Sequence, residues 1–222
     1  MPLSSITNKH EDNLEVNSAK MKLNESKFAD VKPSEPFQHF SKRIAERWNL
    51  KAEIGRRTLI DLYLLDACGD LKEEDNLAIF PEHTVEKTEI AKNLVVHGNI
   101  DYVIATAKHP QGVRQGNLFQ GEEFPNKPFF CVVEAKKEES FGSGRCQTLA
   151  EMKTIWKIAG GNQSVNGALT DGVRWIFYRL SADGGTYYVS DIIDHPTKSH
   201  IITGTLQSFI RGDLPAGFEL PT

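Results

Sequence analysis

The sequence predicts an α/β fold in which a mixed central β-sheet is flanked by helices. Two stretches with apolar residues at helical spacing lie in the first third of the chain, and a third lies at about 144–159. Runs rich in β-branched and aromatic residues fill most of the chain between 81 and 193, on both sides of that third stretch. Helices and strands that follow one another in this way pack as layers on one sheet, which favours an α/β domain.

The chain length of 222 residues suits one domain with terminal extensions. Residues 1–34 are rich in Ser, Asn, Lys and Glu, which predicts a flexible or peripheral arm with one short helix at about Leu14–Phe28. We expect residues 35–215 to form the single domain and residues 216–222 to form a C-terminal tail.

Two helices are expected at the start of the domain. The segment Ser34-Glu35-Pro36 is typical of a helix start, because proline is tolerated in the first turn. Apolar residues at helical spacing continue from Phe37 to Trp48. A second such stretch covers about 51–67, and Cys68-Gly69-Asp70 is expected to end it.

The strands are expected after these helices. Gly98-Asn99 lies between two β-like runs and predicts the turn that joins the first strand pair. Lys108–Lys127 is rich in Gly, Gln, Pro and Asn and predicts a loop or a protruding hairpin. Phe129–Val133 is wholly apolar, which is typical of a strand buried on both faces. Beyond the helix at 144–159, three more strands and a last helix are expected at 165–169, 173–180, 186–193 and 200–210.

Composition and charge exclude several functional classes. The net charge of −4 argues against a non-specific, high-affinity nucleic-acid binder, although an enzyme with a local basic strip remains compatible with it. No apolar run approaches the roughly 18 residues of a membrane span, and the N-terminus has no apolar core of a secretory signal, so no membrane partner is expected. The three cysteines have no paired spacing, which favours a reducing, intracellular location, cytoplasmic or nuclear. Neither paired histidines nor a glycine-rich phosphate loop is present.

An acid and a lysine end the buried strand at Phe129–Val133. Alternation along a strand sends Glu134 and Lys136 to the same side. Asp101 lies in the apolar run Ile100–Thr106, where a carboxylate is costly unless its charge is offset. If the two strands pair, both acids face one site with the lysine beside them. Two carboxylates, a backbone carbonyl and water suit Mg²⁺ or Mn²⁺. The lysine can hold a water or neutralise charge on a phosphate.

Asp101 and the stretch VVEAK, which contains Glu134 and Lys136, resemble the D-x(n)-(D/E)-x-K signature of the PD-(D/E)xK nuclease superfamily, the restriction-endonuclease-like fold. Ile100 stands in place of the proline of that name, a position that is commonly relaxed in the superfamily. Three further stretches are similar to the family in the same order, namely AEIGRRTLIDLYL, RCQTLAEM and NGALTDGVRWIFYRL. The resemblance covers about 37–209. It implies an α-β-β-β-α-β core with an extra N-terminal helix and C-terminal strands and helix.

The resemblance also implies roles for individual residues. Asp101, Glu134 and the backbone carbonyl of Ala135 would bind a divalent metal, and Lys136 would help the attacking water. Glu53, in the first of the three similar stretches, would be an accessory acid bound to the metal directly or through water. On the helix after the E-x-K strand, Gln147 would orient Lys136 or contact the substrate. The implied reaction is hydrolysis of a phosphodiester bond by in-line attack.

Simpler interpretations of these residues remain open. Glu134 and Lys136 are also compatible with a structural salt bridge at a strand end, and Asp101 with a cap on the Gly98-Asn99 turn. A glutamine on a helix, such as Gln147, needs no function.

The accessory acid has the weakest support from the sequence. Glu53 could pair with an arginine three or four residues further along its helix, and Glu46 competes for the same role one helix earlier. Basic residues on the two predicted helices form either a solvated face or a patch that follows a nucleic-acid backbone: Lys42, Arg43, Arg47, Lys51, Arg56 and Arg57.

We therefore expect a metal-dependent nuclease, in the first place a DNA endonuclease, with Mg²⁺ or Mn²⁺ as cofactor and nucleic acid as partner. Nucleases that cut both strands often pair their subunits, so a homodimer is compatible with this hypothesis. The alternative is a catalytically inactive module of the same fold that binds nucleic acid or protein. A third possibility is a metal-dependent enzyme that acts on another phosphate ester.

Overall fold

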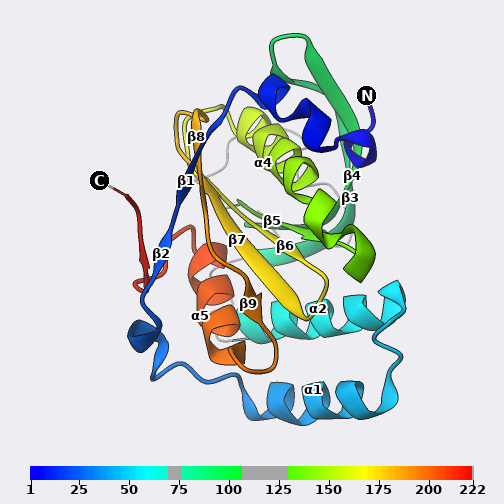
Figure 1. The fold of residues 1–222 in the computed structure, drawn as a ribbon, viewed down its shortest axis with the longest axis vertical. Coiled ribbons are helices and arrows are strands. Elements are labelled where there is room, and N and C mark those ends of the chain that lie inside the picture. Colours follow the sequence, from blue (N-terminus) through cyan, green and yellow to red (C-terminus); the bar gives the residue numbers. More distant parts are fainter. Residues whose placement is uncertain (70–76, 107–129, 222) are drawn as a thin grey trace.

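A computed structural model gives the structure of this chain and describes residues 1–69, 77–106 and 130–221. Its centre is one large β-sheet with the strand order β1-β8-β7-β6-β5-β4-β3, and β9 pairs with β7 (Figure 1). The strands of this sheet are β1 (Asn17–Lys20), β3 (Leu77–Ala91), β4 (Leu94–Thr106), β5 (Phe130–Ala135), β6 (Val165–Thr170), β7 (Arg174–Leu180), β8 (Thr186–Val189) and β9 (Ile193–Asp194). Neighbouring strands are antiparallel except for β5 with β6 and β1 with β8, so the sheet is mixed, as predicted.

Helices cover both faces of this sheet, which makes the molecule an α/β domain (Figure 1). In the part of the chain that the structure describes, the α-helices are α1 (Glu35–Arg47), α2 (Glu53–Cys68), α4 (Arg145–Ile158) and α5 (Ser199–Ile210). One face of the sheet carries α4, the other carries α2 and α5, and α1 packs on the outer side of α2. Within the described ranges, no helix combines the length and the apolar character that crossing a bilayer requires.

Alternation along the central strands divides the core between the two faces. Val132 belongs to the apolar cluster under α4, and Val133, the next residue, belongs to the cluster under α2 and α5. On β7, Trp175 and Phe177 are buried on the α2 and α5 side. Because side chains two residues apart share a face, Glu134 lies on the same side as Val132, towards α4.

The first hairpin turns at a place that the sequence analysis did not predict. Leu94–Thr106 is one continuous strand, so the prediction of a turn at Gly98-Asn99 is wrong. The chain reverses at Lys92-Asn93, where Asn93 adopts a left-handed backbone with φ of 63°. Asparagine tolerates this conformation better than most residues do. Gly98, with φ of +126°, instead occupies a position inside the strand that requires glycine.

The run predicted as one strand at 186–193 forms two short strands, β8 and β9. The Ser190 hydroxyl accepts a hydrogen bond from the Phe177 backbone N–H at 2.9 Å and thereby takes the place of a ladder partner. The chain then leaves β8 and returns to β7 at Ile193. The predicted loop at Lys108–Lys127 lies outside the described residues.

The predicted arm at 1–34 is attached to the domain along most of its length. Three 3₁₀ turns, η1 (Leu3–Ser5), η2 (Asn8–His10) and η3 (Asp12–Leu14), lie against α4 and the β3–β4 hairpin. Leu3 and Leu14 are fully buried in the α4-side core. The short helix predicted at Leu14–Phe28 is absent, because this stretch forms β1, β2 (Lys22–Leu23) and the 3₁₀ turn η4 (Glu25–Phe28). At the other end of the chain, β10 (Phe218–Glu219) pairs with β2.

Candidate active site

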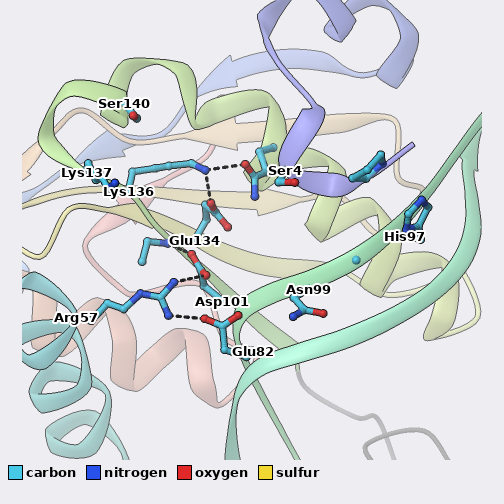
Figure 2. Close-up of a pocket in the computed structure, with 14 residues that line it drawn as sticks. Ser4, Arg57, Glu82, His97, Asn99, Asp101, Glu134, Lys136, Lys137 and Ser140 are labelled. Atoms are coloured by element: carbon cyan, nitrogen blue, oxygen red, sulfur yellow. Dashed lines mark hydrogen bonds and ion pairs between the residues drawn. The ribbon is translucent and has the colours of Figure 1, made fainter. Parts of the chain in front are cut away.

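Asp101 and Glu134 come together because β4 and β5 pair in an antiparallel register. Tyr102 is the ladder partner of Val133, and continuing this register by one residue places Asp101 opposite Glu134. Directly opposite residues on paired strands point to the same face of a sheet. Both acids line a single cavity of about 650 Å³ together with Lys136 and Gln147 (Figure 2). This is the convergence that the sequence predicted.

Both oxygens of Asp101 have partners. Oδ2 accepts a hydrogen bond from the Ala135 backbone N–H at 2.8 Å, and Oδ1 lies 2.7 Å from Nη2 of Arg57. Burial raises the pKa of Asp101, and the Ala135 N–H and the Arg57 charge counteract only part of this effect. A cation near Asp101 would therefore relieve a real electrostatic cost.

Lys136 links strand β5 to helix α4 through its side chain. Its Nζ lies 2.6 Å from Glu134 Oε1 and donates a hydrogen bond to Gln147 Oε1 at 2.6 Å. The Gln147 amide in turn donates to Glu151 Oε1 at 2.9 Å. The predicted contact between Gln147 and Lys136 is thus present, and the chain of polar contacts extends one helical turn further into the protein.

Glu134 and Glu151 form a buried pair of acids. Burial, with the charge of Asp101 added to it, raises the pKa of Glu134 to about 7. Burial and the facing Glu134 raise the pKa of Glu151 well above its ordinary value. Both Oε2 atoms are buried and lack a hydrogen-bond partner as long as both groups are ionised. A proton on Glu151 resolves this, since Glu151 then donates to Glu134, and we conclude that Glu151 is the protonated member.

Residues on two neighbouring segments hold Lys136 and the end of β5 in place. A Cβ atom on Gly144, just before α4, would lie 3.0 Å from Lys136 Cγ and 2.5 Å from a Leu169 methyl carbon, so a larger residue there would crowd Lys136 and force Leu169 to shift. The Lys136 backbone N–H donates to the Thr170 carbonyl at 2.8 Å. The next residue, Asp171, is fully buried and pairs with Arg56 at 2.8 Å. These contacts fix the strand end from which Lys136 projects.

Arg57 and Glu82 line the cavity, although the sequence did not predict either of them as a site residue. Glu82 lies on β3 in the position opposite Asp101, between regular ladder pairs on either side. Its φ of 50° is left-handed, an unusual conformation for a glutamate. Arg57, from α2, places Nη1 2.5 Å from Glu82 Oε1 and reaches Asp101 with its other terminal nitrogen (Figure 2).

The other predicted candidates lie elsewhere or outside the described part of the molecule. Glu53 is the first residue of α2, and its side chain is outside the described structure. Glu46 is exposed on α1. Of the predicted basic patch, Arg56 is buried in its pair with Asp171 and Arg57 lies in the cavity, whereas the remaining members are exposed: Lys42, Arg43, Arg47 and Lys51.

The donor atoms fit a hard divalent cation only in part. Among the residues that the structure describes, no three His, Cys, Asp or Glu side chains gather tightly enough to hold a metal ion on their own. The cavity does offer two carboxylates from neighbouring strands, those of Asp101 and Glu134. Ala135, whose carbonyl is the third expected ligand, lines the same cavity. Such a set, completed by water, suits Mg²⁺ or Mn²⁺, which keep several water ligands in proteins.

Comparison with known proteins assigns no family to this chain. No protein-family model matches the sequence, and no curated protein matches it. Its function is therefore inferred from the charged groups of the cavity and from the elements that carry them.

Proposed function

We propose that this protein hydrolyses phosphodiester bonds in nucleic acid with the help of a divalent metal ion, and that DNA is its substrate. One observation carries the proposal. Asp101 and Glu134 lie opposite each other on neighbouring strands in one cavity, and the Lys136 ammonium lies 2.6 Å from Glu134. Two acids and a positioned lysine in a shared cavity are the groups that metal-assisted hydrolysis uses.

The order of the elements supports the same proposal. Among the described residues, helix α2 is followed by the antiparallel strands β3, β4 and β5, then by α4, and then by β6, which runs parallel to β5. This is the α-β-β-β-α-β order expected for a restriction-endonuclease-like core. The E-x-K segment ends the third of these strands, and Gln147 lies on the following helix, the positions that the family resemblance implies.

Asp101, Glu134 and the carbonyl of Ala135 are the groups that would hold the metal ion. When bound, Mg²⁺ or Mn²⁺ lowers the pKa of a water ligand and polarises the scissile phosphate. Lys136 lines the cavity, and its contacts with Glu134 and Gln147 restrict the positions that its Nζ can take. In the proposed reaction, this ammonium positions the attacking water and offsets negative charge as it develops on the phosphate oxygens.

A cleavage assay tests this proposal. Supercoiled plasmid and single-stranded DNA are incubated with the protein in Mg²⁺, in Mn²⁺ and in EDTA. Cleavage is expected only with metal, and Asp101→Ala and Lys136→Ala should each lower the rate about 100-fold or more, because each removes a group that acts on the reacting atoms. Lys87→Ala, at an exposed position on β3, is the matched control and should cleave like the wild type. Equal cleavage by all variants would rule out the proposed site.

A non-catalytic binding module of the same fold is the second candidate, and one observation favours it. Asp101 and Glu134 already have the cationic partners Arg57 and Lys136, so the charges of the site are offset without a metal. A thermal-shift titration separates the two functions, because a cation that binds the folded state raises its melting temperature. The nuclease requires a rise with Mg²⁺ or Mn²⁺ that Asp101→Asn abolishes, and the binding module requires no rise.

A further inference from the structure

The cavity contains three acids in a row on three adjacent strands. Glu82 of β3, Asp101 of β4 and Glu134 of β5 occupy successive opposite positions across the sheet. Like charges placed directly opposite each other on paired strands destabilise a sheet. The side chains that offset these charges are Arg57, which contacts the first two acids, and Lys136, which contacts the third.

Arg57 is placed to join Glu82 and Asp101 at once. One terminal nitrogen lies 2.5 Å from Glu82 and the other 2.7 Å from Asp101, so the planar guanidinium lies between the two carboxylates (Figure 2). A lysine, with a single point charge, cannot reproduce such a fork. The Arg57 side chain is 23% exposed and that of Asp101 15%, so the Arg57–Asp101 contact is partly shielded from water.

Glu82 adopts a conformation that its own backbone disfavours. A left-handed backbone costs a residue other than glycine roughly 1 kcal/mol or more. The regular ladder pairs on both sides of Glu82 show that the strand itself continues through this position. Strained residues are concentrated at functional sites, where the surrounding contacts hold them in place. Here the contact is the short ion pair between Glu82 and Arg57.

A metal ion that binds Asp101 would meet Arg57, which already holds one of the two carboxylate oxygens. Asp101 Oδ2 is already engaged by the Ala135 N–H, and Arg57 holds Oδ1. We propose that Arg57, held by Glu82, is a resident counter-cation that a divalent ion must displace from Asp101, so that Arg57 sets the metal affinity of the site. This inference rests on the proposed function, because it requires that Asp101 binds a metal.

Isothermal titration of the metal-free protein with Mn²⁺ tests the inference. Arg57→Gln removes the competing cation and should bind Mn²⁺ about 10-fold more tightly than the wild type, the size expected for the loss of one partly shielded ion pair. Removing any positive charge near the cavity makes the cavity attract a cation more strongly. Lys137→Gln, at an exposed lysine that lines the same cavity, measures this general effect and should change the affinity less than about 3-fold.

The outcomes separate this inference from the proposed function. Tighter Mn²⁺ binding by Arg57→Gln than by both the wild type and Lys137→Gln supports the inference. The inference is overturned if Arg57→Gln binds Mn²⁺ no more tightly than the wild type does. It is also overturned if the Mn²⁺ affinity rises equally in Arg57→Gln and Lys137→Gln. Neither outcome contradicts the proposed metal site. Absence of Mn²⁺ binding in every protein overturns both proposals. If Arg57→Gln does not fold, as judged by circular dichroism, Arg57→Lys replaces it and should show a smaller rise in the same direction.

Discussion

At the scale of single residues, the main feature of the site is the protonation of two buried carboxyl groups, those of Glu134 and Glu151. Glu134 is 2% exposed and Glu151 is fully buried, yet only one oxygen of Glu134 has a cationic partner. Because an isolated buried carboxylate is costly, the protein keeps a proton on the pair, and the pKa of both groups is raised. The protonation state of this pair is therefore part of the stability of the fold.

Glu151→Gln should make stability less dependent on pH. A carboxyl with a raised pKa binds its proton more tightly in the folded state, so stability is full below about pH 4.5 and falls as the pH rises through the folded-state pKa, which is about 7 for Glu134. A glutamine does not titrate, so the loss of unfolding free energy between pH 5 and pH 8 should shrink by roughly 1–3 kcal/mol. Urea unfolding in EDTA at both pH values measures this loss.

The matched control for this experiment is Glu139→Gln, at an exposed acid near the cavity. It should keep the pH dependence of the wild type. A wild-type pH dependence in Glu151→Gln as well would mean that Glu151 is not the protonated member of the pair.

Individual residues of the site differed in how well the sequence revealed them. Asp101, Glu134 and Lys136 were predictable, because a charged residue in or after an apolar run is unusual and alternation fixes its side of the strand. Arg57 was visible only as one of several helix arginines. Glu82 left no signal, because its role depends on the register of a hairpin with two irregularities, between Val85 and Thr88 and between Glu89 and Ala91.

At the scale of elements, the hairpin of β3 and β4 decides which residues of the cavity meet. With a regular ladder starting from the Lys92-Asn93 turn, Asp101 would lie opposite Thr84. The two register shifts bring Glu82 into that position instead. Turn position and bulges depend on local backbone conformation, which propensity and periodicity do not specify. This is why the predicted turn was misplaced and the single strand β4 was predicted as a pair of strands.

Asn93→Ala should destabilise the protein by about 1 kcal/mol, because alanine in a left-handed conformation carries a steric cost that asparagine carries less and glycine does not. Asn93→Gly should be neutral or slightly stabilising. Asn99→Ala, at the wrongly predicted turn, is the matched control. It removes only an exposed hydrogen bond with Thr84 and should cost less. Urea unfolding checks all three variants, and a larger loss in Asn99→Ala than in Asn93→Ala would contradict the placement of the turn.

At the scale of the whole molecule, the N-terminal arm completes the core on the face of the sheet that carries α4. Leu3 and Leu14 are buried there beside residues of the helix and the β3–β4 hairpin. Pro2 and Ser4, between which Leu3 lies, line the cavity itself. The polar composition of this segment predicted a loosely attached arm, because the few apolar residues that anchor it are far apart in sequence.

Leu3→Ala should therefore destabilise the protein by about 2–4 kcal/mol, since it removes a fully buried side chain and leaves a cavity. Leu65→Ala, at a leucine of α2 that is 63% exposed, is the matched control and should cost less than about 1 kcal/mol. Thermal unfolding measures both. A loss in Leu3→Ala as small as that of the control would mean that the arm is not part of the core in solution.

The central claim is that two acids from neighbouring strands hold one divalent ion beside Lys136. A crystal soaked in Mn²⁺ tests it most directly, because the anomalous signal locates the metal and the map identifies its ligands. We predict a peak in the cavity with oxygens of both Asp101 and Glu134 within about 2.5 Å of it. A fully soaked crystal without a peak there, or with a peak that neither carboxylate contacts, would contradict the proposed site and the reaction inferred from it.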